Sequence, residues 1–147
     1  MHHPDRSFAL EVSMDLVKGA EILSKKPPVH FHVQEEYIEA IQGRMGLELN
    51  GVEHVLTPTT GRVSIPPFVH HVSYPLSPER QEPGTKEVKF LLSGERTDSV
   101  FELNPVFFEN WYRYQDLIVT HGEKISLMQL FSVSFLPLSA NGKVLIC

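Results

Sequence analysis

Short stretches in which apolar and polar residues alternate occupy the first two thirds of the chain. Successive side chains of an extended strand point to opposite faces, so this alternation predicts strands that are buried on one face. The predicted strands cover residues 7–12, 29–32, 37–42, 45–49, 54–56, 63–65, 69–74 and 88–92. Met45, Leu47 and Leu49, for example, form one apolar stripe. Residues 13–24 match neither the helical nor the strand period and stay open as strand or loop.

Turn-forming residues separate these strands at regular intervals. Asn50-Gly51 is a strong hairpin signal, because both residues tolerate the positive φ angles of a two-residue turn. A second break covers residues 57–61. Residues 75–85 form a linker rich in Pro, Gly, Ser and charge, which we expect over a barrel mouth or on the surface. Short strands with such turns favour an all-β fold closed by antiparallel pairing.

The last third of the chain changes to a helical pattern. Asn104 can cap a helix that has Pro105 in its first turn, and the helix is predicted to end at His121-Gly122. Its apolar residues recur at helical spacing: Phe107, Trp111, Tyr114 and Ile118. We expect this aromatic face to pack against the outside of the barrel, with direct contact to a substrate as the alternative.

Residues 125–136 form a further apolar segment, which is predicted as a second helix or as a β element. Four of its side chains would form a surface too apolar to remain exposed: Leu127, Met128, Leu130 and Phe131. Such surfaces commonly mark contacts between subunits, so we expect a homodimer.

Length and composition agree with a single domain over residues 1–147, with the barrel at about 7–95 and a helical segment at about 104–136. A net charge of −5 gives no electrostatic footprint for nucleic acid. The single cysteine, Cys147, allows no disulfide within the chain, which favours a reducing compartment and a cytoplasmic location. The first residues lack the pattern of a signal peptide, and no apolar run reaches the roughly 18 residues that span a bilayer.

The candidate chemistry lies in three histidines and one glutamate. The spacing of His30 and His32 points both rings to one face of an extended strand. Glu36 lies on the alternate positions that carry the inward-facing residues of the next strand, and a later strand delivers His71. Four metal-binding side chains can therefore converge. Mixed nitrogen and oxygen donors suit Fe, Mn, Ni, Cu or Zn better than Mg or Ca.

Each histidine also has an ordinary interpretation, because a single strand histidine is more often a hydrogen-bonded core or surface residue than a ligand. The combined spacing of four ligand types is what favours metal binding here. His70 would face away from the site in a regular strand. A bulge at Val69, however, could exchange the roles of His70 and His71.

The same residues resemble the two motifs of the cupin superfamily. The first motif is written G-x5-H-x-H-x3-E-x6-G, and the chain fits it with Ser24 in place of the first glycine. The matching residues are His30, His32, Glu36 and Gly43. The resemblance implies a cupin-type antiparallel β-barrel, or jelly roll, with one or two C-terminal α-helices.

The second cupin motif is written G-x(4 or 5)-P-x-G-x2-H-x3-N. Gly61, Pro66 and His71 match it. Phe68 stands at the second glycine and Pro75 at the asparagine. The stretch from the start of the first motif to the end of the second spans roughly a third of the chain, so a chance match is a poor explanation.

The resemblance to cupins also implies a metal-dependent activity. One divalent transition metal, iron first with Mn, Ni, Cu or Zn as alternatives, would be held by four ligands: His30, His32, Glu36 and His71. The leading interpretation is a dioxygenase that binds a substrate oxygen and dioxygen at the metal. The alternatives are an isomerase, cyclase, dehydratase or decarboxylase that uses the metal as a Lewis acid, and a non-catalytic small-molecule-binding cupin. Residues 107–116 also loosely resemble the tail of small fungal cupins found beside biosynthetic enzymes.

Glu36 has two predicted roles, as a metal ligand or, if it is released, as a general base. We expect an apolar cavity around it that takes a small aromatic or polyketide-like molecule. The residues expected to line this cavity are Ile38, Ala40, Met45, Leu47 and Phe68. Phe68 would narrow the mouth of the cavity, or would instead fill core space.

Overall fold

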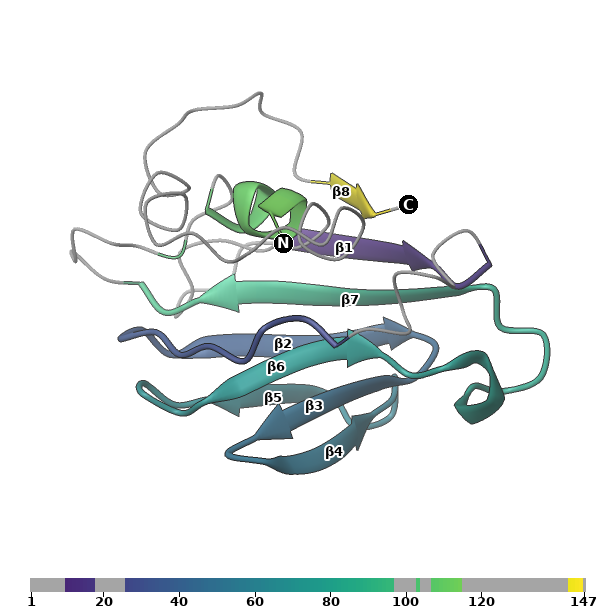
Figure 1. The fold of residues 1–147 in the computed structure, drawn as a ribbon, viewed down its shortest axis with the longest axis horizontal. Coiled ribbons are helices and arrows are strands. Elements are labelled where there is room, and N and C mark those ends of the chain that lie inside the picture. Colours follow the sequence, from purple (N-terminus) through teal and green to yellow (C-terminus); the bar gives the residue numbers. More distant parts are fainter. Residues whose placement is uncertain (1–9, 18–25, 97–102, 104–106, 115–142, 147) are drawn as a thin grey trace.

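The structure is a computed structural model, which describes residues 10–17, 26–96, 103, 107–114 and 143–146. These residues contain eight strands, one 3-10 turn and one short helix at 107–114 (Figure 1). The elements are β1 (Leu10–Asp15), β2 (Glu36–Gln42), β3 (Met45–Leu49), β4 (Val52–Leu56), β5 (Arg62–Ile65), β6 (His71–Pro75), η1 (Pro78–Arg80), β7 (Glu87–Gly94) and β8 (Lys143–Ile146). Within these residues, no helix has the length and apolarity needed to cross a membrane.

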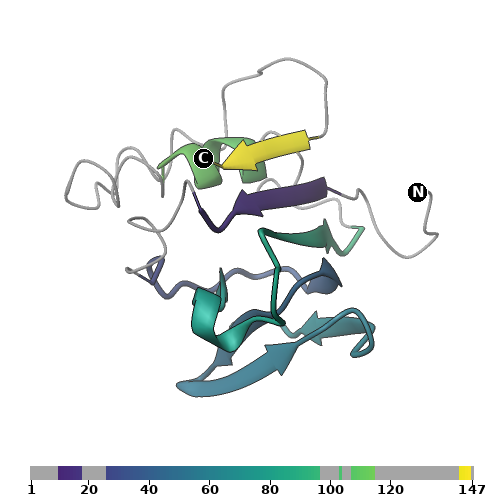
Figure 2. The same cartoon turned by 90° about the vertical axis from the view of Figure 1, so that its right-hand side faces the viewer.

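The strands form two sheets. The larger sheet has the order β5-β2-β7-β1-β8, and the smaller sheet has the order β4-β3-β6. Every pairing is antiparallel except that of β8 with β1, which is parallel. In the two perpendicular views, the helix at 107–114 lies at the β1 and β8 side of the larger sheet (Figure 2). This antiparallel arrangement confirms the predicted all-β, cupin-type fold class.

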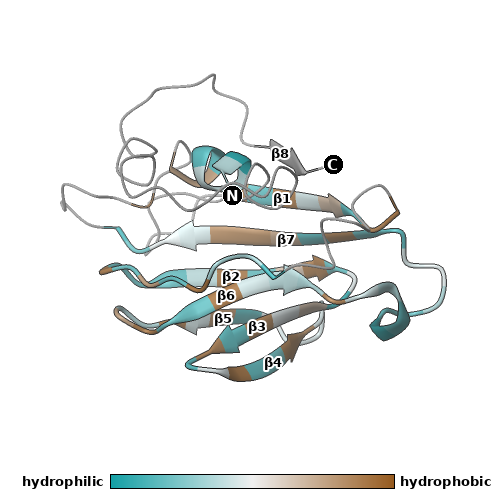
Figure 3. Ribbon diagram, viewed as in Figure 1, coloured by the Kyte–Doolittle hydropathy of each residue, from teal (hydrophilic) through white to brown (hydrophobic). Residues whose placement is uncertain are grey.

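A hydrophobic core joins the two sheets. In the larger sheet, Ile38 of β2 pairs with Leu92 of β7, so their inward side chains lie in register. Met45 and Leu47 of β3 contribute to the same core from the smaller sheet. These four side chains are at most 1% exposed. Figure 3 shows hydrophobic residues along the length of β7. Burying a side chain of this size stabilises the fold by about 1.5–3 kcal/mol, so the alternating pattern is a main source of stability.

Several element boundaries differ from the sequence predictions. The first strand ends at Asp15 instead of residue 12, and the start of the predicted strand, at 7–9, lies outside the described residues. β8 was not predicted from the sequence. Within the predicted helix at 104–121, the structure describes only residues 107–114, and the segment 125–136 lies outside the described residues.

The predicted strand at 29–32 forms only an isolated bridge. His30 exchanges two main-chain hydrogen bonds with His71, with N···O distances of 3.0 and 2.8 Å. The two residues before this segment are Pro27 and Pro28, and proline has no N–H to extend a ladder. The bridge nevertheless holds His30 beside the first residue of β6.

The linker at 75–85 is fixed to the smaller sheet by Gln81, whose side chain is buried. Its amide nitrogen donates to the carbonyl oxygens of Arg44 and Leu76 at 2.7 and 2.9 Å. Its amide oxygen accepts the Arg44 N–H at 2.8 Å. The linker is therefore an ordered loop over the turn between β2 and β3.

Gly43 occupies that turn, with φ at +73°. A Cβ atom there would lie 2.9 Å from Cγ2 of Val88 and 3.2 Å from the carbonyl oxygen of Glu87. Gly61 has almost the same φ, +71°, but a Cβ atom there would meet nothing within 4 Å. The positive φ angle thus favours glycine at both positions, and the close approach of β7 favours it further at Gly43.

We expect Gly61→Ala to lower the free energy of unfolding by about 1–2 kcal/mol, the cost of a left-handed non-glycine residue. Gly43→Ala should cost a further 1–3 kcal/mol or so, because the new methyl group also overpacks against β7. Urea denaturation of both variants measures the difference. Equal losses would mean that the contact with Val88 relaxes without cost.

Candidate metal centre

Four side chains lie together between the two sheets, three from one short stretch of the chain and one from a distant strand. His30 and His32 come from the segment before β2, Glu36 is the first residue of β2, and His71 is the first residue of β6. One ring nitrogen from each histidine lies within 4.8 Å of the others. Oε2 of Glu36 lies 2.9 Å from Nε2 of His32 and 3.1 Å from Nε2 of His71.

Main-chain carbonyl groups orient all three imidazoles. Nδ1 of His30 lies 3.2 Å from the carbonyl oxygen of Pro28, and Nδ1 of His32 lies 2.5 Å from that of Gln34. Nδ1 of His71 lies 2.8 Å from that of Val69. Because a carbonyl oxygen only accepts, each Nδ1 carries the proton, and a neutral ring then keeps its lone pair on Nε2. This tautomer is the one that second-shell carbonyls fix in metal-binding histidines.

The donor set fits a metal cation. With Nδ1 protonated, His32 and His71 can donate from Nε2 to Glu36 only as positively charged imidazolium rings. A cation bound among these atoms would replace those protons, because it accepts the lone pairs of both imidazoles and of the carboxylate. Three nitrogen donors and one oxygen donor suit a transition metal.

The protonation states of Glu36 and His30 favour metal binding. Burial raises the pKa of Glu36, but hydrogen bonds from His32 and His71, together with their charge, outweigh it and lower this pKa to about 2. Burial and the nearby His71 lower the pKa of His30 to about 4. Burial also opposes the charged form of His71, but its hydrogen bond with Glu36 raises its pKa. At neutral pH the site therefore holds an ionised carboxylate and a neutral His30, the forms that ligate metals.

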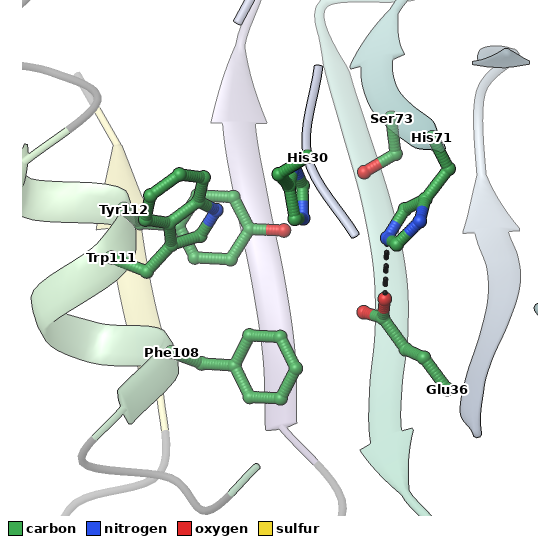
Figure 4. A pocket seen from close by; sticks show the side chains of 7 residues that line it. All are labelled: His30, Glu36, His71, Ser73, Phe108, Trp111 and Tyr112. Atoms are coloured by element: carbon green, nitrogen blue, oxygen red, sulfur yellow. Dashed lines mark hydrogen bonds and ion pairs between the residues drawn. The ribbon is translucent and has the colours of Figure 1, made fainter. Parts of the chain in front are cut away.

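A pocket opens onto this cluster (Figure 4). Its empty volume is about 260 Å³, counting space that is open to solvent. The lining residues are His30, Glu36, His71, Ser73, Phe108, Trp111 and Tyr112. Three of these seven come from the helix at 107–114, so this helix forms one wall of the pocket.

The helix wall corrects the expectation that the aromatic face packs against the outside of the barrel. The ring of Trp111 lies 4.9 Å from that of His30, and Phe108 and Tyr112 belong to the main core. Phe108 and Tyr112 are four residues apart, which is itself a helical signal, but their role in the pocket was missed. Periodicity shows which side chains share a face and cannot show which cavity that face covers.

The residues predicted to line a substrate cavity lie elsewhere in the described structure. Ile38, Ala40, Met45 and Leu47 are in the hydrophobic core and do not line the pocket at the histidine cluster. Phe68 is 64% exposed. Its N–H donates to the carbonyl oxygen of His32 at 2.8 Å, which fastens the segment that carries His30 and His32.

His70 and His71 differ sharply in their surroundings. His71 is 2% exposed and faces Glu36. His70 is exposed, and its ring lies against that of Phe31, with the ring centroids 5.2 Å apart. The two adjacent histidines therefore form a matched pair for testing the site.

We expect His71→Ala to lose most of its bound metal, with affinity reduced at least about 10-fold, because it removes an inward-facing nitrogen donor. His70→Ala is the control and should keep the metal. Elemental analysis of the two purified variants provides the measurement. Metal loss in the His70 variant alone would contradict this assignment.

Comparisons with known proteins place the chain among fungal relatives. It is 37% identical over 122 residues to an oxidoreductase of Arthrobotrys oligospora, an alignment that covers 82% of this chain and 47% of the relative. It is 38% identical over 137 residues to the probable oxidoreductase yanE of Aspergillus niger, an alignment that covers 88% of this chain and 51% of the relative. The chain thus spans about half the length of these curated relatives.

No protein-family model matches the chain. Among solved structures, it is similar to a cupin-2 domain containing protein from Shewanella frigidimarina, at 15% identity and a TM-score of 0.44, covering 65% of this chain and 76% of that one. The motifs and the antiparallel two-sheet topology carry the assignment of the fold. The chain has an antiparallel two-sheet fold of the cupin type and is similar in sequence to fungal proteins that are named oxidoreductases.

Proposed function

We propose that the chain is a metal-dependent oxidoreductase that holds one divalent transition metal in the site between its sheets. The proposed ligands are His30, His32, Glu36 and His71. The observation that carries the proposal is the meeting of one buried carboxylate oxygen with two Nε2 atoms at 2.9 and 3.1 Å, beside a third imidazole. The names of the fungal relatives support the reaction class.

Iron is the metal that we favour. Affinity alone would not select it, because Ni, Cu and Zn bind nitrogen donors at least as strongly. Zinc, however, has no redox chemistry and would not serve an oxidoreductase by electron transfer. When bound, a redox-active metal would supply the electrons that activate dioxygen, so we propose an oxygenase.

The pocket supports a small aromatic substrate, or the reactive end of a polyketide-like molecule. Phe108 and Trp111 line one side of the space, and the metal cluster lies on the other. A planar ring that carries oxygen substituents matches both the walls and the polar end.

Glu36 serves this chemistry as a ligand in our proposal, not as a general base. Oε2 already contacts two imidazoles, and the pKa near 2 makes the carboxylate a weak proton acceptor at neutral pH. A general base works best when its pKa lies near the working pH. The same two contacts that bring the carboxylate into the site therefore remove it from proton transfer.

We expect Glu36→Gln to weaken metal binding by about 100-fold or more, because a neutral amide oxygen replaces the charged ligand; even outer-shell changes cost 10–100-fold. Glu35→Gln is the matched control, since the Glu35 carboxylate accepts hydrogen bonds from Tyr37 and Ser64 instead. Competition with a chromogenic chelator measures both affinities. Equal affinities in the two variants would exclude Glu36 as a ligand.

The oxygenase reaction is tested by loading the metal-free protein with Fe(II) or with Zn(II) and supplying simple phenols and catechols. We expect oxygen uptake, measured with an oxygen electrode, only with Fe(II). The zinc form controls for the protein itself. Turnover by the zinc form without oxygen uptake would contradict the oxygenase and favour Lewis-acid chemistry.

A further inference from the structure

Tyr112 is a buried polar group in the pocket that the metal site does not use. Its side chain is 5% exposed and projects from the helix at 107–114. Figure 4 shows the hydroxyl group directed across the pocket, toward His30 and the β6 side, where Ser73 and His71 lie. A tyrosine hydroxyl group in such a position needs hydrogen-bond partners.

We propose that Tyr112, paired with Ser73, recognises a second oxygen of an aromatic substrate whose first oxygen faces the metal site. This inference rests on the proposed function and deepens it, because it assigns the residues that select the substrate. The substrate class would be single aromatic rings with two neighbouring oxygens, such as catechols. Tyr112 would be a specificity-determining residue.

Ser73 is placed for this role by the alternation of β6. It lies two residues after His71, so both side chains face the pocket. Tyr112 lines the same pocket from the opposite side. Each of the two hydroxyl groups has one O–H donor, which a ligand oxygen in the pocket can accept.

The phenol group remains a donor at all ordinary pH values. Burial raises the pKa of Tyr112, and the negative charge of Glu36 raises it further, while the hydrogen bond with Ser73 lowers it. The net effect is a neutral hydroxyl group. A neutral donor that is buried and held in place discriminates strongly between ligands that have an acceptor and ligands that lack one.

Trp111 fixes the plane in which a ring could lie. Its indole ring stacks on Phe107, with an interplanar angle of 8° and centroids 6.4 Å apart, and it tilts by 57° over His30. Phe108 lines the same side of the pocket. These aromatic side chains therefore form the side of the pocket that lies opposite Glu36 and His71.

The test uses the protein loaded with Zn(II), which binds without oxidising the probes, and follows absorbance during titration. The probes are 4-nitrocatechol and 4-nitrophenol, which lacks the second oxygen. We expect Tyr112→Phe to weaken nitrocatechol binding by roughly 3- to 10-fold, the value of one neutral hydrogen bond, and to leave nitrophenol binding unchanged. Zinc content should equal that of the wild type.

Tyr114→Phe is the matched control, because Tyr114 is a buried tyrosine of the same helix that does not line this pocket. It should bind both probes like the wild type. If Tyr112→Phe does not fold, Ser73→Ala supplies the second test. This variant should weaken the binding of 4-nitrocatechol and leave the binding of 4-nitrophenol unchanged.

If Tyr112→Phe weakens the binding of both probes equally, or of neither, the proposed role of Tyr112 is wrong. The proposed metal site would still hold in that case, provided that the protein binds zinc. A zinc-loaded wild type that binds neither probe would also overturn the role of Tyr112. Failure of the wild type to bind any metal would instead overturn the proposed function, and this inference with it.

Discussion

The buried carboxylate of Glu36 is the constraint on which the site depends. Glu36 is 5% exposed, and an uncompensated carboxylate at such a position would cost several kcal/mol. Its Oε2 atom is compensated by His32 and by His71, which begins a strand of the other sheet. The buried negative charge is therefore compensated only where the start of β2 and the start of β6 lie close together. A bound cation would also compensate this charge.

The segment that carries His30 and His32 is held in place without being a regular strand. The main chain of His30 forms two hydrogen bonds with that of His71 on β6, and the carbonyl oxygen of His32 accepts a hydrogen bond from the N–H of Phe68. Phe68 has φ at +64°, at the position where the cupin motif has glycine. A left-handed non-glycine residue costs about 1–2 kcal/mol, and the surrounding contacts must maintain it. Phe68 thus adopts at this position a φ angle that glycine would adopt without steric cost.

The helix at 107–114 forms the aromatic wall of the pocket at the histidine cluster. Trp111, Phe108 and Tyr112 lie opposite Glu36 and His71, so one stretch of helix supplies both an aromatic surface and a hydroxyl group. This wall comes from outside the two cupin-like motifs. The motifs contain the candidate ligands, and the helix covers the space beside them.

The sequence by itself determined most strands of the two sheets, the turns at Asn50-Gly51 and at residues 57–61, and the four candidate ligands, because alternation and fixed spacing are local properties of the chain. Only the tertiary structure decided that Ile38 and Met45 fill the core while Tyr112 enters the pocket. It also showed that the segment at 29–32 forms a single bridge. These outcomes depend on which surfaces meet across the two sheets, and packing between distant segments leaves no periodic signal in the sequence of either one.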